Sequence, residues 1–289
     1  MRDAITKKDM LVLFLLVLGF TFLFTPPVMG DELPILHEKT FKVSPGAKLD
    51  LGTSPGDVLV KGWDKNEVQI VIRCNDKAKE NMKFKMELEN GNVVVRGEKV
   101  NDSGWFSLGN MKVKYEIHVP QDFNVAVKTS GGDVDLRDIV GNAELKTSGG
   151  DIEVDSFRGS ADITTSGGDI NAVNFTGDIN AATSGGDIML KGKDSRINAS
   201  TSGGDVKVFY SGENKGIDLS TSGGDIDLFI PSGTKADINL RTSGGEISCG
   251  VETTSVTSTS KTKLEAKING GGEEIRCSTS GGDVSLKKN

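Results

Sequence analysis

Apolar and polar residues alternate along most of the chain. Ile152, Val154, Ala161 and Ile163, for example, are each followed by a polar or acidic residue. A period of two is typical of β-strands that bury one face. The pattern therefore predicts short strands, and after residue 30 only the stretch 77–83 reads as a candidate helical turn.

The alternating runs are separated by the hexapeptide Thr-Ser-Gly-Gly-Asp-Ile/Val, which recurs at a nearly fixed period. The first five full copies follow one another at a constant interval. A period of about 20 residues is the signature of a solenoid, in which each repeat is one coil that buries its apolar side against its neighbours. The copies begin at Thr129, Thr147, Thr165, Thr183, Thr201, Thr221, Thr242 and Thr279, and a degenerate copy begins at Thr53.

Two geometries fit such a repeat. Coils can stack in parallel, or the chain can form an antiparallel meander with Ser-Gly-Gly as the hairpin turn. The constant identity period favours parallel stacking, because it places each residue on its own copy in the next coil. We therefore predict an all-β fold, a parallel β-solenoid (β-helix) of about 18-residue, two-strand coils, after an N-terminal signal helix.

The N-terminal segment 1–30 has the pattern of an export signal. Basic residues precede an apolar run at 11–24, and a Pro-Pro pair at 26–27 follows it. The run is shorter than a membrane span, which needs about 20 residues. Segment 1–30 is therefore predicted to be a signal peptide cleaved before Asp31, with an uncleaved N-terminal anchor as the alternative. Either interpretation places the remaining chain at the cell surface, in the periplasm or in the extracellular space, and limits membrane contact to an uncleaved N-terminal segment.

The exported part reads as one domain with two stretches. Residues 31–128 are predicted to form irregular N-terminal coils of the solenoid, with insertions at 75–83 and 101–110. Residues 129–289 are predicted to form the regular coils that begin with the repeated hexapeptide. No segment between them has the composition of a linker.

The net charge and the positions of the cysteines limit which partners and which covalent links the chain is expected to have. The chain of 289 residues has a net charge of −7 and no basic stripe or cluster in its sequence, which argues against a nucleic-acid partner. Cys74, Cys249 and Cys277 continue the apolar alternation, so they are predicted to be small buried residues. Cys249 and Cys277 fall on opposite sheets, too far apart for a disulfide, and a bridge between them is the alternative.

Several segments resemble a known family of proteins. They are the segment 51–58 (LGTSPGDV), Gly62-Trp63-Asp64, the Val119-Pro120 corner, and the segment 268–272 (INGGG), together with the coils between them. Over most of residues 38–286 the chain is similar to the bacterial and archaeal putative adhesin domains of unknown function, which are described as β-strand repeat-containing. The resemblance implies an exported β-solenoid. It implies no catalytic residues, because the family has no agreed ones to carry over.

An acidic residue follows the two glycines of each copy, and these side chains are predicted to point outward in a column. Like charges one strand spacing apart, about 4.8 Å, repel each other. We expect each carboxylate to offset this by accepting backbone N–H groups of its own Gly-Gly turn. The alternative is calcium bound between coils by Asp151, Asp169, Asp187 and Asp205, and no other metal or cofactor is predicted.

Hydroxyl and aromatic side chains are the remaining candidates. The repeated threonines are predicted to lie at or inside the corner and to satisfy turn backbone groups, with a flat ice- or glycan-binding face as the alternative. Trp105 and Phe106 in the insertion 101–110, and Phe209 and Tyr210 after a coil, are candidate partner contacts. The competing interpretation is that they cover the core or an end of the solenoid.

The residue inventory argues against catalysis. The chain has two histidines and no Ser/His/Asp order, metal-ligand cluster or phosphate loop. We therefore expect no enzyme but an adhesin-like binding module at the cell envelope, with an envelope glycan or protein as partner. A structural spacer of the envelope and a polysaccharide-active β-helix enzyme are the two alternatives.

Overall fold

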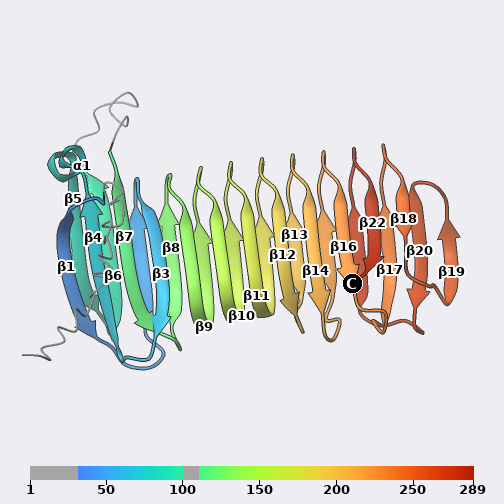
Figure 1. The fold of residues 1–289 in the computed structure, drawn as a ribbon, viewed down its shortest axis with the longest axis horizontal. Coiled ribbons are helices and arrows are strands. Elements are labelled where there is room, and N and C mark those ends of the chain that lie inside the picture. The colour runs from blue at the N-terminus through green and yellow to red at the C-terminus, as the bar shows by residue number, and fades with distance from the viewer. Residues whose placement is uncertain (1–31, 101–110) are drawn as a thin grey trace, which may run out of the picture. The chain divides into compact units, whose positions relative to one another are not determined.

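The computed structural model describes residues 32–100 and 111–289. The segment 1–30, predicted as signal peptide or anchor, lies outside the described residues. The described strands belong to one compact unit, Leu33–Asn289, and they confirm the predicted all-β solenoid with predominantly parallel stacking (Figure 1). Within the described ranges, no helix has the length and apolar character needed to cross a membrane.

Three long strands define the regular coil. In each of them, a bend near the middle places the first half in one sheet face and the second half in the opposite face, which are called face A and face B below. The strands pair in parallel, so that Ile152 lies beside Val134 and Ile170. They are β9 (Val134–Lys146), β10 (Ile152–Thr164) and β11 (Ile170–Ala182).

The coils that follow use one strand in each face. Parallel pairing continues from β11 to β12 in face A and from β11 to β13 in face B. The face A strands are β12 (Ile188–Lys193), β14 (Val206–Ser211), β16 (Ile226–Ile230), β18 (Ile247–Cys249) and β22 (Val284–Lys288). The face B strands are β13 (Ile197–Ser200), β15 (Ile217–Ser220), β17 (Ala236–Arg241), β19 (Ser255–Thr259), β20 (Lys263–Ile268) and β21 (Glu274–Ser278).

The N-terminal stretch extends both faces in the same way. In face A it contributes β1 (Ile35–Lys42), β3 (Asp57–Trp63), β4 (Glu67–Cys74) and β7 (Val113–Pro120). In face B it contributes β2 (Lys48–Thr53), β5 (Met82–Glu89), β6 (Asn92–Lys99) and β8 (Asn124–Thr129). The one described helix, α1 (Asp76–Asn81), overlaps the predicted helical turn, and the Asn75 side chain caps it by accepting the Ala78 N–H.

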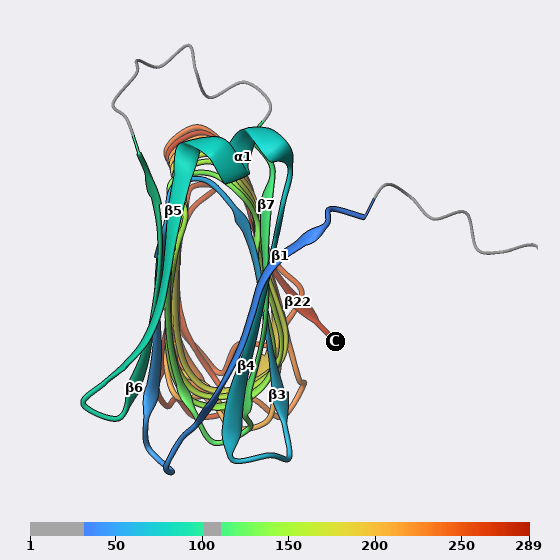
Figure 2. The ribbon, with the colours of Figure 1, turned by 90° about the vertical axis from the view of Figure 1, so that its left-hand side faces the viewer.

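The interior is a column of small aliphatic side chains from both faces. Ile152 and Val154 of face A and Ala161 and Ile163 of face B are each at most 1% exposed. Figure 2, which looks along the stack from its N-terminal end, shows the two faces enclosing a flattened interior. One coil buries too few of these side chains to offset the entropy of ordering its backbone, so neighbouring coils must stack.

The spatial order of the coils departs from chain order at both ends of the stack. The coil β2–β3 lies between β6–β7 and β8–β9, because β2 pairs with β6 and β8 while β3 pairs with β7 and β9. At the other end, β21 lies between β15 and β17, and β22 lies between β16 and β18 (Figure 1). The last coil of the chain is thus inserted between two coils that precede it in sequence.

Antiparallel pairs occur only at the two ends of the described stack. At the N-terminal end, β4 pairs with β1 and β7, and β5 pairs with β6. At the C-terminal end, β20 pairs with β17 and β19. The predicted parallel geometry therefore holds throughout the regular coils, and hairpins finish the stack.

Candidate functional site

The Ser-Gly-Gly corner is built from bonds between successive coils. The Thr165 hydroxyl donates to the carbonyl of Gly150 in the preceding coil at 2.9 Å and accepts the Gly168 N–H at 3.3 Å. The same pair of bonds recurs at Thr183, and the repeated threonines are only 2–8% exposed. The predicted inward position is confirmed, so these hydroxyls form no exposed ladder for ice or glycan.

Close coil-to-coil approach explains the second glycine of each turn. A Cβ added at Gly168 would lie 2.1 Å from the carbonyl oxygen of Gly150, far inside contact distance. At the neighbouring Gly167, the nearest atom to an added Cβ is 3.8 Å away. The second glycine is therefore required by packing, whereas an added Cβ at Gly167 would make only ordinary contacts.

The acidic residues form the predicted outward column, but their hydrogen bonds differ from the prediction. The Asp151 carboxylate accepts the backbone N–H of Asp169 in the next coil at 2.8 Å, and Asp169 and Asp187 do the same for Asp187 and Asp205. The expectation that each carboxylate serves its own turn is therefore wrong. One carboxylate oxygen per coil is used to tie the stack together, which offsets the repulsion along the column.

The structure gives the calcium alternative no ligand set. Over residues 32–100 and 111–289, no group of three or more His, Cys, Asp or Glu side chains is arranged to hold a metal ion. Asp151, Asp169, Asp187 and Asp205 stay one per coil along the corner. The column therefore reads as part of the architecture.

The candidate aromatic contacts have three different outcomes. Trp105 and Phe106 lie outside the described residues. Tyr210 is completely buried, and its hydroxyl accepts the Ser195 N–H at 2.9 Å. Tyr210 is therefore no exposed contact, and the competing interpretation, that it covers the core, holds because it continues the inward alternation of Val206 and Val208. Burial raises the pKa of this phenol.

Phe209 does face outward and is half-buried. Its ring stacks on Phe229 of the neighbouring coil, with centroids 4.6 Å apart and planes 13° from parallel. The Lys207 ammonium lies 5.4 Å from the Phe209 centroid, and Lys287 lies 5.4 Å from the Phe229 centroid. This cation-flanked aromatic pair remains a candidate contact surface.

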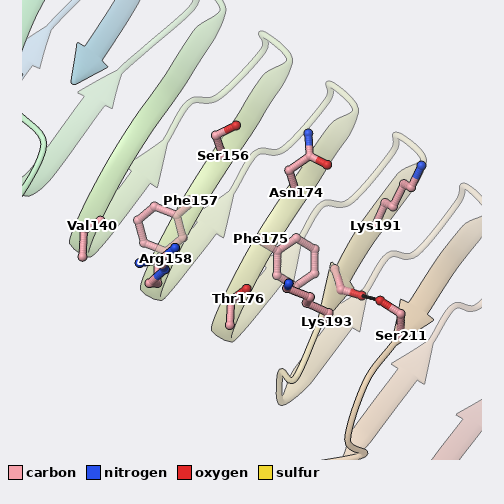
Figure 3. Close-up of a pocket in the computed structure, with 11 residues that line it drawn as sticks. Val140, Ser156, Phe157, Arg158, Asn174, Phe175, Thr176, Lys191, Lys193 and Ser211 are labelled. Atoms are coloured by element: carbon pink, nitrogen blue, oxygen red, sulfur yellow. Dashed lines mark hydrogen bonds between the residues drawn. The ribbon is translucent and has the colours of Figure 1, made fainter. Parts of the chain in front are cut away.

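A groove runs along the looser corner of the coils, at the opposite end of each coil from the Ser-Gly-Gly turn. Its volume is about 480 Å³, which lies within the range of about 300–1,000 Å³ typical of small-molecule sites. The Phe157 and Phe175 rings lie between two rows of polar side chains (Figure 3). The rings are only 3% and 2% exposed, so they form the floor of the groove.

The two rows follow from the parallel register. One row consists of Ser156, Asn174 and Lys191, and the other consists of Val140, Arg158, Thr176, Lys193 and Ser211 (Figure 3). Members of the second row are neighbours on five successive strands, from β9 to β14. At about 4.8 Å per strand, the row extends for about 19 Å.

Backbone conformation at the corner creates the hollow. Ser156 and Asn174 adopt left-handed conformations, with φ of 58° and 55°. The next coil lacks an equivalent residue, so the register shifts and Phe175 lies beside Gly192. A Cβ at Gly192 would lie 2.4 Å from the Phe175 ring, so only glycine leaves room for that ring.

Three cations border the groove without a carboxylate partner. Arg158, Lys191 and Lys193 are exposed, and none of the ion pairs found among the described residues includes them. Elsewhere on the sheet, Arg137 binds Asp135 and Lys146 binds Glu144 at 2.7 Å. The groove therefore concentrates uncompensated positive charge on a protein whose net charge is −7.

The carboxylate of Asp155, next to this corner, already accepts two hydrogen bonds. Asp155 accepts hydrogen bonds from the Asn174 amide at 2.8 Å and from the Ser156 hydroxyl at 3.0 Å. These two bonds lower the pKa of Asp155. Asp155 therefore stays ionised beside the first row, but it forms none of the ion pairs found among the described residues and does not line the groove.

Sequence reasoning missed the groove above Phe157 and Phe175. Its cations lie at different repeat positions, so they form no stripe in the sequence and meet only because the coils stack in parallel. The available signal was the presence of one basic residue at the loose corner near 158 and of two more at the loose corner two coils later, near 191–193. The inference that the chain has no basic cluster is therefore correct for the sequence and wrong for the folded surface.

The positions and the burial of the cysteines agree with the prediction in most respects. Cys74, Cys249 and Cys277 are free thiols. Cys249 pairs with Leu286 in face A, whereas Cys277 pairs with Leu219 in face B, so the two lie on opposite faces as predicted. Cys74 and Cys277 are buried and burial raises the pKa of both thiols, while Cys249 is only half-buried.

Comparison with known proteins places this architecture in a recognised group. Residues 47–287 match the family described as Toastrack DUF4097. Among curated proteins, no match was found.

Solved structures resemble the chain only at low identity. A putative lipid binding protein from Parabacteroides distasonis is 13% identical, with coverage of 86% of this chain and 96% of its own and a TM-score of 0.49. A putative adhesin from Bacteroides fragilis is 15% identical, with coverage of 88% and 96% and a TM-score of 0.33. A putative cell adhesion protein from Clostridium sporogenes is 14% identical, with coverage of 88% and 99% and a TM-score of 0.25. Likenesses at this level carry no argument about function.

Proposed function

Since the chain belongs to the Toastrack DUF4097 family, we propose that it is an exported, non-catalytic β-solenoid that acts as an adhesin-like binding module at the cell envelope. The corner groove is its binding surface. The observation that carries this proposal is the set of three exposed, unpaired cations over an aromatic floor. Exposed charges contribute little to stability, whereas cations that converge on one hollow can hold an anionic ligand.

The scaffold suits a preformed binding surface. The groove lies on β9 to β14, and each of these strands has a hydrogen-bonded neighbour on both sides. A site built on paired strands keeps its geometry without a ligand, which lowers the entropy cost of binding. The export part of the proposal rests on the apolar run within residues 1–30.

The groove offers little support for the polysaccharide-cleaving alternative. Its lining contains no carboxylate and no imidazole, which are the groups that usually act as general acid or base in such reactions. The lining can hold a ligand by charge, hydrogen bonds and apolar contact. Binding without turnover is therefore the function that this geometry supports best.

The spacer alternative has one observation in its favour. The bonds from threonine and aspartate side chains connect each regular coil to the next whether or not a ligand is present. A spacer would depend on these connections and on the number of coils, and it would not depend on surface side chains. The two functions therefore make opposite predictions for variants of the groove.

The test compares binding of the purified full chain to isolated cell envelopes with binding of two double variants. Arg158→Gln with Lys193→Gln removes two groove cations, and Lys42→Gln with Lys61→Gln removes two exposed cations elsewhere. We expect only the groove variant to lose binding. Equal binding by all three proteins, or recovery of the native chain only from the cytoplasm, would refute the proposal.

A further inference from the structure

We infer that the groove binds the acidic groups of a linear carbohydrate polymer that lies along the stacking direction of the coils. This inference rests on the proposed function, because it names the ligand class of the same groove. It follows from the spacing of the cations, the hydrogen-bonding groups between them and the absence of a free strand edge.

The cations occupy two levels of the groove, with Arg158 on β10 and with Lys191 and Lys193 on opposite sides at β12 (Figure 3). Arg158 and Lys193 lie two strands apart in the same row, which separates their backbones by about 10 Å. Lys191 and Lys193 lie two residues apart on β12, about 7 Å along the strand. This distribution suits a ligand with several acidic groups along its length better than one small anion.

The cations differ in what they can bind. The planar fork of Arg158 can hold a carboxylate or a sulfate through two parallel hydrogen bonds. Lys191 and Lys193 offer compact charges on flexible stems and adapt to acidic groups at variable spacing. Exposed charge pairs each contribute little, so affinity depends on several contacts along one polymer and weakens with salt.

The uncharged members of the rows fit a carbohydrate. Thr176 presents a hydroxyl between Arg158 and Lys193, and Ser211 presents one next to Lys193. Ser156 and Asn174 donate to Asp155 but keep oxygens that can accept. Sugar hydroxyls both donate and accept hydrogen bonds, as these side chains do. The Ser211 hydroxyl has only a long bond, 3.4 Å, to the Gly192 carbonyl.

Two other ligand classes fit the groove less well. An extended peptide is usually captured by adding a strand to a sheet edge, but every strand of the groove is paired on both sides. An anionic membrane attracts a protein with many clustered basic residues, whereas this chain has net charge −7. The acidic polymer is the class that needs only a narrow line of cations.

The experiment measures binding of the full chain to polygalacturonate, to dextran sulfate and to neutral dextran by calorimetry. We expect binding to one or both acidic polymers, none to neutral dextran, and loss of affinity as sodium chloride rises. Arg158→Gln with Lys193→Gln should weaken binding about tenfold or more. Lys42→Gln with Lys61→Gln, which changes the net charge equally, should leave it unchanged, and circular dichroism verifies that both variants fold.

The outcomes separate this inference from the proposed function. If the groove variant loses binding to cell envelopes but neither acidic polymer binds the native chain, the carbohydrate inference is wrong and the binding function stands. Binding only to polyglutamate or to phosphatidylglycerol vesicles would identify a different ligand class and overturn the inference. Salt-sensitive self-association abolished by the groove variant would identify a second copy of this chain as the occupant, with the same consequence.

Discussion

The sharpest test of the coil geometry compares two adjacent glycines of one turn. Gly168→Ala places a Cβ 2.1 Å from the Gly150 carbonyl oxygen, and Gly167→Ala places one at least 3.8 Å from its neighbours. Neither glycine has a positive φ, so alanine is not strained by conformation at either position. The two variants therefore differ only in the space between coils.

The cost of Gly168→Ala can be estimated from the bonds beside it. To relieve the clash, the coils must separate by about 1 Å at this corner, because carbon and oxygen need roughly 3 Å or more. Separation breaks the bond from the Thr165 hydroxyl to Gly150 and the bond from the Asp169 N–H to Asp151. Each bond contributes about 0.5–1.5 kcal/mol and overpacking costs about 1–3 kcal/mol, so we expect a loss of roughly 2–6 kcal/mol. Gly167→Ala should be neutral or stabilise by up to about 1 kcal/mol through the unfolded state.

Thermal unfolding and amide hydrogen exchange check this prediction. Gly168→Ala should lower the melting temperature by several degrees and speed exchange of the Asp169 N–H, while Gly167→Ala should change neither. Equal effects of the two substitutions would show that the second glycine is not held against the preceding coil. The inter-coil account of the repeat would then be wrong.

Two further predictions concern burial. Ile170→Asp should lower the free energy of unfolding by several kcal/mol, because Ile170 is 1% exposed and a carboxylate there has no partner. Asp169→Asn keeps an oxygen that accepts the Asp187 N–H, so it should be near neutral in the same thermal unfolding experiment. A larger loss of stability for Asp169→Asn would invert the assignment of inward and outward positions. Burial raises the pKa of Tyr115, which bonds Thr53, from 10.0 to about 12, so the folded state keeps its phenol protonated where the unfolded state loses the proton. The stability from this phenol is complete below pH 10 and about 2–3 kcal/mol of it is lost as the pH rises to 12; denaturant titrations should show this slope in the native chain and not in Tyr115→Phe.

Most of the fold could be predicted because the repeat specifies it many times over. The alternation of Ile152 and Val154 with acidic residues sets their burial, and the fixed period sets the parallel register. The same alternation, followed two residues beyond Val208, places Tyr210 inside. Local pattern thus determines which way a side chain points.

Other features depend on relations that no local pattern contains. The coils that begin at Thr221, Thr242 and Thr279 have equivalent sequences, so nothing in any one of them says which is its neighbour. The order is visible only in contacts, since an added Cβ at Gly282 would meet Gly224 and one at Gly245 would meet Gly282. The groove likewise depends on a register shift after Val173 and on cations from different repeat positions. Such features arise only when the coils assemble, so they cannot be predicted from the sequence of one repeat.

The inserted last coil imposes an order of events on the newly made chain. Strands β17 and β18 are synthesised before β21 and β22. In the stack, however, β21 and β22 separate β17 and β18 from the coil that precedes them in sequence. Until segment 274–289 arrives, β17 and β18 lack the strands that join them to β15 and β16, and their neighbours are limited to the segment 255–268. Completion of the stack is thereby coupled to the synthesis of residues 274–289: a chain that stops before residue 274 lacks the element that joins β17 and β18 to the rest, and it exposes the apolar column to proteolysis.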